Sequence, residues 1–222
     1  MEQRPLVIMM DVDNTLLDND RAKRDMDAAL LQMLGPADAA RFWHLYEAVR
    51  DETSVVDFPL TLTRFQAQYA EAGRFHELEQ FFNTFPYERY VFPEVPQVLA
   101  HLWTLGTPVI VSDGDPVFQA YKIRHSGLDT AVRGNVLIFD HKDQHLDEIA
   151  ARFPAERYVM VDDKEPILDR LKDAWGRRIV TVHVCQGKYS TLPTMPPAPD
   201  IEIDQIGDLL RFTADDFRPQ GG

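Results

Sequence analysis

Near its N-terminus the chain carries Leu6-Val7-Ile8-Met9-Met10-Asp11-Val12-Asp13-Asn14-Thr15, an apolar run that ends in two carboxylates set two residues apart. An uninterrupted apolar run is typical of a parallel strand covered on both faces, because a half-exposed strand alternates with polar residues. In open α/β sheets the carboxyl ends of the strands face the ligand crevice, so acids there are candidates for function. A simple turn is the alternative, since Asp and Asn side chains bond their own backbone after strands.

Similar apolar runs recur along the chain and alternate with helical patterns. Further strands are predicted at Val109 to Val111, Val136 to Phe139, Tyr158 to Val161, Ile179 to Val184 and Ile201 to Ile203. Apolar residues at helical spacing predict helices at Val95 to Leu105, His145 to Phe153 and Ile167 to Trp175, with Gly106 and Gly176 as stops. Strands that alternate with helices predict an α/β fold, a doubly wound Rossmann-like parallel sheet.

The stretch from about Asp18 to Phe92 differs because it contains no convincing strand and is rich in aromatic residues. Helices are predicted at Arg24 to Leu34, Ala37 to Arg50, Leu60 to Ala72 and Phe75 to Phe85, separated by Gly35-Pro36, Thr53 to Pro59 and Gly73. We expect a smaller all-helical cap domain at residues 18–92, with an α/β core at residues 1–17 and 93–222. The proline-rich segment Leu192 to Pro199 is predicted to be a surface connection.

The composition limits the classes of partner. The chain has 222 residues, with 36 Asp and Glu against 23 Lys and Arg, for a formal net charge of −13. This excess argues against nucleic acid as a partner, because phosphate backbones are bound by Lys and Arg. A small phosphate ester is still compatible with it if a local metal cation supplies positive charge.

The sequence also bears on the compartment. The apolar runs are too short for a signal peptide or a bilayer span, so we expect a cytoplasmic protein with no membrane partner. Cys185 is the single cysteine, which excludes an intrachain disulfide, and we expect it to be a buried strand residue. The oligomeric state is not indicated.

Polar side chains follow the later predicted strands at the points where these strands end. Ser112-Asp113-Gly114 follows the second strand, Lys142 follows the third, and Asp162-Asp163 follows the fourth. Because the carboxyl ends of parallel strands meet at one edge of the sheet, all of these groups are expected to converge with Asp11 on a single crevice.

In this order and strand context the chain resembles the haloacid dehalogenase-like (HAD) superfamily of hydrolases. The stretch from Asp11 to Thr15 is similar to its first motif, Ser112 to its second, Lys142 to its third, and Asp162-Asp163 to its fourth. The segments Tyr121-Lys122-Ile123 and Ser126-Gly127-Leu128 also look like the family's sequence between its second and third motifs. The predicted helices after the first motif are similar to the cap that many members insert there.

The resemblance implies a Mg²⁺-dependent hydrolase of small phosphorylated metabolites that forms an aspartyl phosphate. Asp11 would be the nucleophile, and Asp13 would protonate the leaving oxygen and later activate water. Mg²⁺ would be held by Asp11, Asp163 and the Asp13 carbonyl, with Asp162 as a further ligand or a supporting acid. The implied substrate-binding residues are Thr15, Ser112, Asp113 and Gly114, and Lys142 would offset the negative charge.

Some assignments stay open at this stage. Asp143 follows Lys142 where the family often has proline, so Lys122 and Lys164 are alternatives for the site lysine, although both are expected to be solvated. Family phosphatases usually carry a further acid or Asn four or five residues after the metal ligand of the fourth motif, where this chain has Ile167 and Leu168 and then Asp169.

Other functions are also compatible with the pattern. Dehalogenase members resemble one another in having tyrosine at the position of Asp13, so Asp13 favours phosphoryl transfer. A phosphomutase, a dehalogenase and a non-catalytic binding protein are the alternatives. His141 and His145 are four residues apart but lack the zinc-protease pattern, and we expect them to be surface residues.

Overall fold

A six-stranded parallel sheet forms the centre of the protein, in a computed structural model that describes residues 6–53, 56–69, 72–188 and 198–218. The spatial order is β3-β2-β1-β4-β5-β6, and every neighbouring pair is parallel. The strands are β1 (Leu6–Met10), β2 (Thr107–Asp113), β3 (Val136–Phe139), β4 (Arg157–Asp162), β5 (Ile179–Val184) and β6 (Ile201–Ile203). The predicted α/β, doubly wound, Rossmann-like parallel sheet is confirmed.

The strand order fixes where a ligand crevice forms. The chain builds outward from β1 to β2 and β3, and then returns to the other side of β1 to add β4, β5 and β6. The order therefore reverses between β1 and β4, and a doubly wound sheet opens its crevice at the carboxyl ends of such a strand pair. The backbone N–H of Asp11 donates to the Val161 carbonyl at 3.0 Å, which extends the pairing into the first residue after β1.

Helices cover both faces of the sheet. On one face, α8 (Leu146–Arg152) and α9 (Glu165–Trp175) pack on a cluster that includes Val7, Met9 and Met160. On the other face lie α5 (Val95–Leu105), α6 (Pro116–His125), α7 (Leu128–Ala131) and the 3-10 helix η5 (Ile206–Arg211). Because the strands are buried on both sides, their sequences are continuously apolar, as the sequence pattern predicted.

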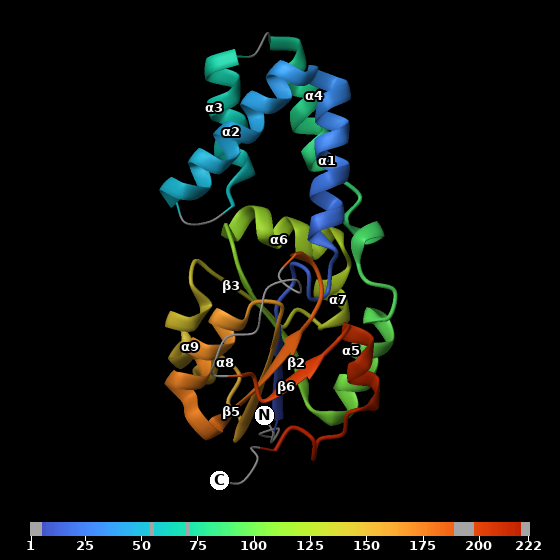
Figure 1. Cartoon of the computed structure of the whole chain (residues 1–222), viewed down its shortest axis with the longest axis vertical. Coiled ribbons are helices and arrows are strands. Elements are labelled where there is room, and N and C mark those ends of the chain that lie inside the picture. The colour runs from blue at the N-terminus through green and yellow to red at the C-terminus, as the bar shows by residue number, and fades with distance from the viewer. Residues whose placement is uncertain (1–5, 54–55, 70–71, 189–197, 219–222) are drawn as a thin grey trace.

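The segment between β1 and α5 is helical and gathers at one end of the molecule, at the top of Figure 1. Its elements are α1 (Asn19–Leu34), α2 (Pro36–Thr53), α3 (Phe58–Tyr69), α4 (Ala72–Asn83) and the 3-10 helix η1 (Tyr87–Tyr90). Helix α1 begins earlier than predicted, because Asp18 caps it by accepting from the Arg21 N–H at 2.9 Å. Gly73 lies within α4, so the prediction that it separates two helices is wrong. An isolated glycine costs a helix only about 1 kcal/mol.

Aromatic side chains form the core of this helical group and join it to the rest of the protein. Phe42 of α2 stacks on Phe82 of α4, with ring centroids 5.5 Å apart, and also contacts Phe58. The ring centroid of Phe58 in turn lies 4.6 Å from that of Phe118 of α6. The expected core role of these aromatic residues is thus confirmed, and part of that core reaches across to α6.

The sequence pattern did not predict helices α6 and α7. It also did not predict two further 3-10 helices, η2 (Lys142–Gln144) and η3 (Gly176–Arg178). Among the described residues no helix is both long and apolar enough to cross a membrane. The predicted connection Leu192 to Pro199 falls largely outside the described residues.

Candidate active site

Buried carboxylates gather around one lysine at the carboxyl ends of β1 and β4. Asp11 directly follows β1, Asp162 ends β4, and Asp163 follows it. Lys142, the first residue of η2, is 1% exposed. Its Nζ lies 2.7 Å from Asp11 Oδ1 and 2.6 Å from Asp162 Oδ2. Residues that lie far apart in the sequence therefore meet at the point where the strand order reverses.

Burial and charge shift the proton affinities of this cluster in different directions. Burial raises the pKa of Asp11, but Lys142 and Lys164 outweigh it and hold that pKa below its usual value. Burial, and then the charges of Asp162 and Asp11, raise the pKa of Asp163 to about 8. Burial lowers the pKa of Lys142, but Asp11 and Asp162 raise it by more. Asp11 is thus held as a carboxylate, whereas Asp163 retains a proton at neutral pH when no cation is bound.

The chemistry of this cluster fits a divalent cation. Asp11 Oδ2 and both side-chain oxygens of Asp163 are buried and accept no well-aligned hydrogen bond from the described residues. One oxygen each from Asp11, Asp162 and Asp163 lies within 4.8 Å of the others. Buried carboxylates are costly unless they are paired, protonated or bound to a cation, and Mg²⁺ prefers such hard oxygen ligands. The orphaned oxygens therefore provide suitable ligands.

Asp13 pairs with a second lysine. Lys122 Nζ lies 2.7 Å from Oδ1 and 2.8 Å from Oδ2 of Asp13. Lys122 is buried, so the prediction that it is a solvated helix lysine is wrong. The reason is that α6 packs against β3 and η1 and carries Lys122 into the site. Lys142 thus contacts Asp11 and Asp162, whereas Lys122 contacts Asp13.

The turn that carries Asp13 is tightly packed. Asn14 has a left-handed φ of 61°, and its N–H donates to the Leu17 carbonyl at 2.7 Å. Gly187, in the loop after β5, has a φ of +66°, and a Cβ added there would lie 2.5 Å from Asn14 Cγ. Only glycine fits this approach of the loop to the turn. Gln186 strengthens the contact by donating to the Asn14 carbonyl at 3.1 Å.

The residues at the end of β2 connect neighbouring elements. Ser112 Oγ accepts a hydrogen bond from Gln119 Nε2 of α6 at 2.9 Å, and Asp113 Oδ1 accepts one from the Lys142 backbone N–H at 2.7 Å. Thr15, expected to bind substrate, is fully buried, and its hydroxyl has no hydrogen-bond partner among the described residues. Gly114 donates its N–H to the Phe139 carbonyl at 2.8 Å.

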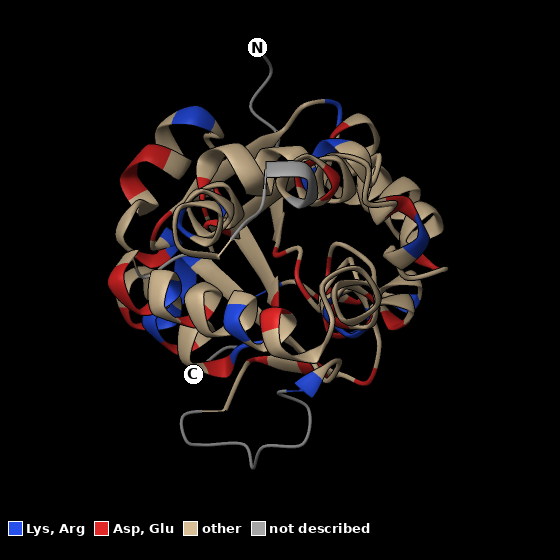
Figure 2. Cartoon of the chain, turned by 90° about the horizontal axis from the view of Figure 1, so that it is seen from above, with Lys and Arg blue, Asp and Glu red and all other residues tan. Residues whose placement is uncertain are grey.

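A cleft of about 320 Å³ opens between these strand ends and the helices above them. Its floor includes Asp13, Asp113, Gly114 and Lys164, whereas α1 and α2 contribute side chains to its upper wall. Lys164 was expected to be solvated, but it is half-buried and lies near the carboxylate cluster, where Asp11, Asp162 and Asp163 raise its pKa despite burial. In the view from above, Lys and Arg residues are interspersed with Asp and Glu residues around the periphery (Figure 2).

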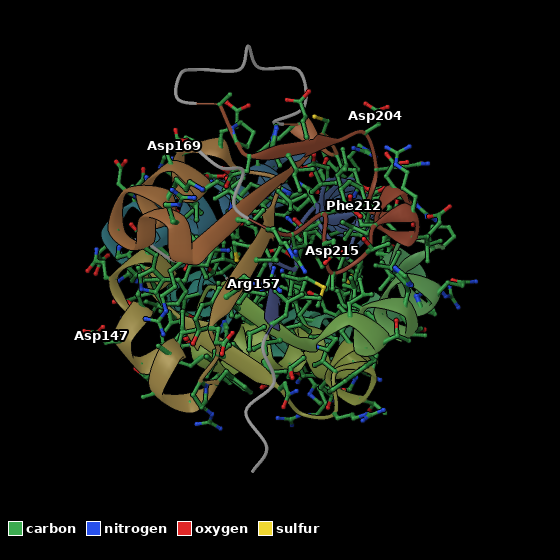
Figure 3. The ribbon with its side chains drawn as sticks, turned by 90° about the horizontal axis from the view of Figure 1, so that it is seen from below. Asp147, Arg157, Asp169, Asp204, Phe212 and Asp215 are labelled. Atoms are coloured by element: carbon green, nitrogen blue, oxygen red, sulfur yellow. The ribbon has the colours of Figure 1, made fainter. Side chains whose placement is uncertain are left out.

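Several other residues considered from the sequence lie outside this site. His141 is exposed, as expected, and half-buried His145 lies 3.2 Å from Asp140 Oδ1. Asp169 does not join the carboxylate cluster and lies at the outside of the molecule (Figure 3). Cys185 follows β5 and is half-buried, so its prediction as a buried strand residue is wrong; its Sγ lies 3.7 Å from His183 Nδ1.

Sequence reasoning missed Gln119 and undervalued Lys122 and Lys164. A signal for α6 was present, because Asp115-Pro116 is a helix N-cap followed by proline at the first helical position. The Asp115 side chain accepts from the N–H groups of Val117 and Phe118. A helix that starts there carries Gln119 toward Ser112 and Lys122 toward Asp13.

Comparisons with known proteins agree with this fold. A protein of Burkholderia xenovorans LB400, whose solved structure is described as haloacid dehalogenase-like, is 39% identical over 94% of this chain and 98% of its own, with a TM-score of 0.86. The magnesium-bound HAD hydrolase YfnB of Bacillus subtilis has 18% identity over 95% of this chain and 100% of its own, with a TM-score of 0.63.

The L-2-haloacid dehalogenase PA0810 has 15% identity over 92% of this chain and 97% of its own, with a TM-score of 0.63. The two more distant structures share the fold. One is described as a hydrolase and the other as a dehalogenase, so they do not distinguish phosphate ester hydrolysis from dehalogenation. Comparisons with protein-family models and with curated proteins gave no match. At 39% identity over nearly its whole length, the chain belongs to the haloacid dehalogenase-like hydrolases.

Proposed function

We propose that the protein hydrolyses small phosphate monoesters with the help of Mg²⁺, through an aspartyl phosphate on Asp11. The observation that carries this proposal is the pair Asp11 and Asp13: one carboxylate is held ionised by Lys142, and the other, two residues on, lines the cleft. A nucleophile and an acid–base group so close together match the needs of double displacement at phosphorus.

In the first step, Asp11 attacks phosphorus and the bond to the ester oxygen breaks. Asp13, which enters this step protonated, donates that proton to the leaving oxygen, and Lys122 beside its two oxygens holds its side chain in position. In the second step, water attacks the same phosphorus, Asp13 takes the proton from the water, and the bond to Asp11 breaks. Both carboxyl groups return to their starting states.

The orphaned oxygens of Asp11 and Asp163, with Asp162 beside them, would hold the cation. When bound, Mg²⁺ would polarise the phosphoryl group and reduce its repulsion from the carboxylate nucleophile. Lys142 and Lys164 add fixed positive charge beside Asp11, which attracts the phosphate. The magnesium bound to the structural neighbour YfnB is in line with this assignment.

We further propose that residues 18–92 act as a cap over the reaction. The cleft is lined from both sides, by Lys23, Tyr46 and Arg50 of the helices and by Asp13 and Gly114 at the strand ends. A cap that excludes water strengthens the electrostatic contacts and limits side reactions. The leaving group would occupy the part of the cleft beside α1 and α2.

A screen of phosphorylated metabolites and 2-haloacids, with Mg²⁺ and with a chelator, tests this function. We expect Mg²⁺-dependent release of inorganic phosphate from at least one small ester, and its loss in Asp11→Asn. Asp38→Asn in α2 is a matched control that keeps activity, because half-buried Asp38 pairs with Arg41 and does not line the cleft. Metal-independent halide release would favour a dehalogenase, and phosphoryl transfer between substrates without net release would favour a mutase.

A further inference from the structure

The helices above the cleft carry two cations toward it, and Asp20 of α1 also lines the cleft. Lys23 of α1 and Arg50 of α2 both line the cleft, together with Tyr46, Val56 and, from the loop after β5, Lys188. A volume of about 320 Å³ is near the lower end of small-molecule pockets and exceeds the room that one phosphate group needs. The rest of a substrate therefore extends from the reacting phosphate toward this wall.

Lys23 is held by aromatic side chains rather than by an acid. Its Nζ lies 3.2 Å from the Tyr46 hydroxyl, 4.6 Å from the centroid of the Tyr46 ring and 5.7 Å from that of Trp43. Among the described residues, no carboxylate forms a salt bridge with it. Burial lowers the pKa of Lys23 and the charge of Glu47 raises it; Lys188 and Arg50 lower it further, Asp20 raises it, and the net pKa lies below its usual value. A half-buried ammonium between an aromatic wall and a cleft keeps donors available for a ligand.

Arg50 lies on the next helix and adds a second cation to the same wall. Its Nη1 lies 3.0 Å from Glu47 Oε2, one turn earlier in α2. That single contact leaves other N–H groups of the guanidinium to bind a second planar anion, since Arg has five donors in a fork. Its side chain is 43% exposed, so its contact with Glu47 is not locked by packing.

Lys122 provides a comparison, because it is a lysine of the same region that is paired with an acid. It contacts both oxygens of Asp13, whereas the direct partners of Lys23 among the described residues are the neutral Tyr46 hydroxyl and the Tyr46 and Trp43 rings. Partial burial of a cation without an acid is costly, and an anion bound in the cleft offsets that cost. The difference between the two lysines indicates that the partner of Lys23 comes with the ligand.

We propose that Lys23 and Arg50 bind a second anionic group, a carboxylate or a second phosphate, on the leaving-group part of the substrate. This inference rests on the proposed phosphatase function and names its substrate class: small phosphate esters with a second negative charge. The Tyr46 and Trp43 rings fix the ammonium of Lys23, and the fork of Arg50 selects planar or tetrahedral oxyanions over neutral groups.

Matched substrates test the proposal. One series consists of phosphate monoesters of ω-hydroxy carboxylic acids with different spacer lengths, and its partner series consists of the corresponding carboxamides. A third series of α,ω-diol bisphosphates, set against the monophosphates, distinguishes a phosphate from a carboxylate as the second anion. At the best spacer we expect kcat/KM for the anionic member to exceed that of its neutral partner by about tenfold or more.

The variants Lys23→Met and Arg50→Gln should each lose most of that preference, mainly through KM, and Lys23→Arg should regain part of it. Arg41→Gln is the control, because Arg41 pairs with Asp38 at 2.9 Å and does not line the cleft. A protein that hydrolyses both members of each pair equally, or a preference that survives in both variants, would overturn the proposal.

The same pairs, made as non-hydrolysable phosphonates, separate this inference from the proposed function. If no ester is hydrolysed, the phosphatase assignment fails, and calorimetry with Mg²⁺ still tests the binding site. Tighter binding of the carboxylate phosphonate than of its carboxamide, lost in Lys23→Met, would support the site. Equal binding of both, or no binding of either, would contradict it.

Discussion

Lys142 Nζ contacts Asp11 Oδ1 at 2.7 Å, although the two residues are 131 positions apart in the chain. The contact forms at the reversal of strand order, where a lysine that follows β3 reaches across the end of β2 to the end of β1. It keeps the proposed nucleophile charged in a place where burial alone would protonate it. Two further lysines, Lys122 and Lys164, surround the same group of acids.

Replacing Lys142 should cost both stability and activity. Lys142→Met leaves Asp11 and Asp162 without their buried cation, and breaking one side of a buried ion pair typically costs about 3 to 5 kcal/mol. We expect a large fall in the free energy of unfolding, measured with urea, and loss of phosphatase activity. Lys172→Met is the control, because Lys172 pairs with Asp200 at a site where its side chain is 32% exposed. That variant should lose less than about 1 kcal/mol, and equal losses in both would contradict the account.

Asp13→Asn should slow the reaction in a way that depends on the leaving group. Without an acid at this position, alkyl phosphates lose the proton that their leaving oxygen needs, so we expect a fall of about 10²- to 10⁴-fold. Esters of nitrophenol, which leave without protonation, should be affected less in the first step. Steady-state and burst kinetics over a series of leaving groups measure this difference. An equal loss for every leaving group would argue against Asp13 as the general acid.

The metal-free protein should become less stable as pH rises from about 5 to 8. The raised pKa of Asp163, about 8, means that the folded state keeps a proton which the unfolded state has already lost above its ordinary pKa near 4. The unfolded state therefore binds fewer protons in this range, and the free energy of unfolding falls by at least about 1 kcal/mol.

Denaturant curves in chelator at several pH values measure this slope, and added Mg²⁺ should reverse it at pH 8. Asp163→Asn should make the slope clearly shallower and remove the Mg²⁺ response, while the raised pKa values of Asp162 and Asp113 leave a smaller slope. Identical pH dependence in the parent and in Asp163→Asn would show that another group is responsible.

The loop after β5 should prove necessary for the shape of the turn after β1. Gly187→Ala adds a methyl group that would lie 2.5 Å from Asn14 Cγ, whereas Gly134→Ala has a comparable positive φ but no neighbour within 4 Å. Both variants carry the backbone strain of alanine at positive φ, of about 1 kcal/mol, and only Gly187→Ala adds the clash. We expect only Gly187→Ala to lower kcat, and similar kcat values in the two variants would contradict the role assigned to this contact.

The positions of Asp11, Ser112, Lys142 and Asp162 at strand ends could be predicted because buried parallel strands have a strong local signature. The end of such an apolar run also predicts the end of the strand, and the parallel topology brings the carboxyl ends of the strands together. Lys122 could not be placed in this way. Its helix is weakly amphipathic, and whether one lysine on it faces solvent or Asp13 depends on how α6 packs against β3 and η1.

The side chains that line the cleft from α1 and α2 illustrate a second limit of prediction from sequence. Lys23, Tyr46 and Arg50 lie on two helices. The sequence predicts both, although it starts the first at Arg24, after Lys23, and it does not give the angle at which they meet the strand ends. Arg41 and Arg64 have the same residue type and the same kind of helix, yet they pair with Asp38 and Glu52 and do not line the cleft. Tertiary packing alone separates the arginine that faces the cleft from those that do not.

The measurement that bears most directly on the mechanism is the trapping of the covalent intermediate. The protein is mixed with a hydrolysed ester and Mg²⁺, quenched in acid within the first turnover, and digested for mass spectrometry. We expect one phosphoryl group on the peptide that contains Asp11, removed by hydroxylamine and absent in Asp11→Asn. Full-rate phosphate release with no label on Asp11, or with the label on another residue, would contradict the account.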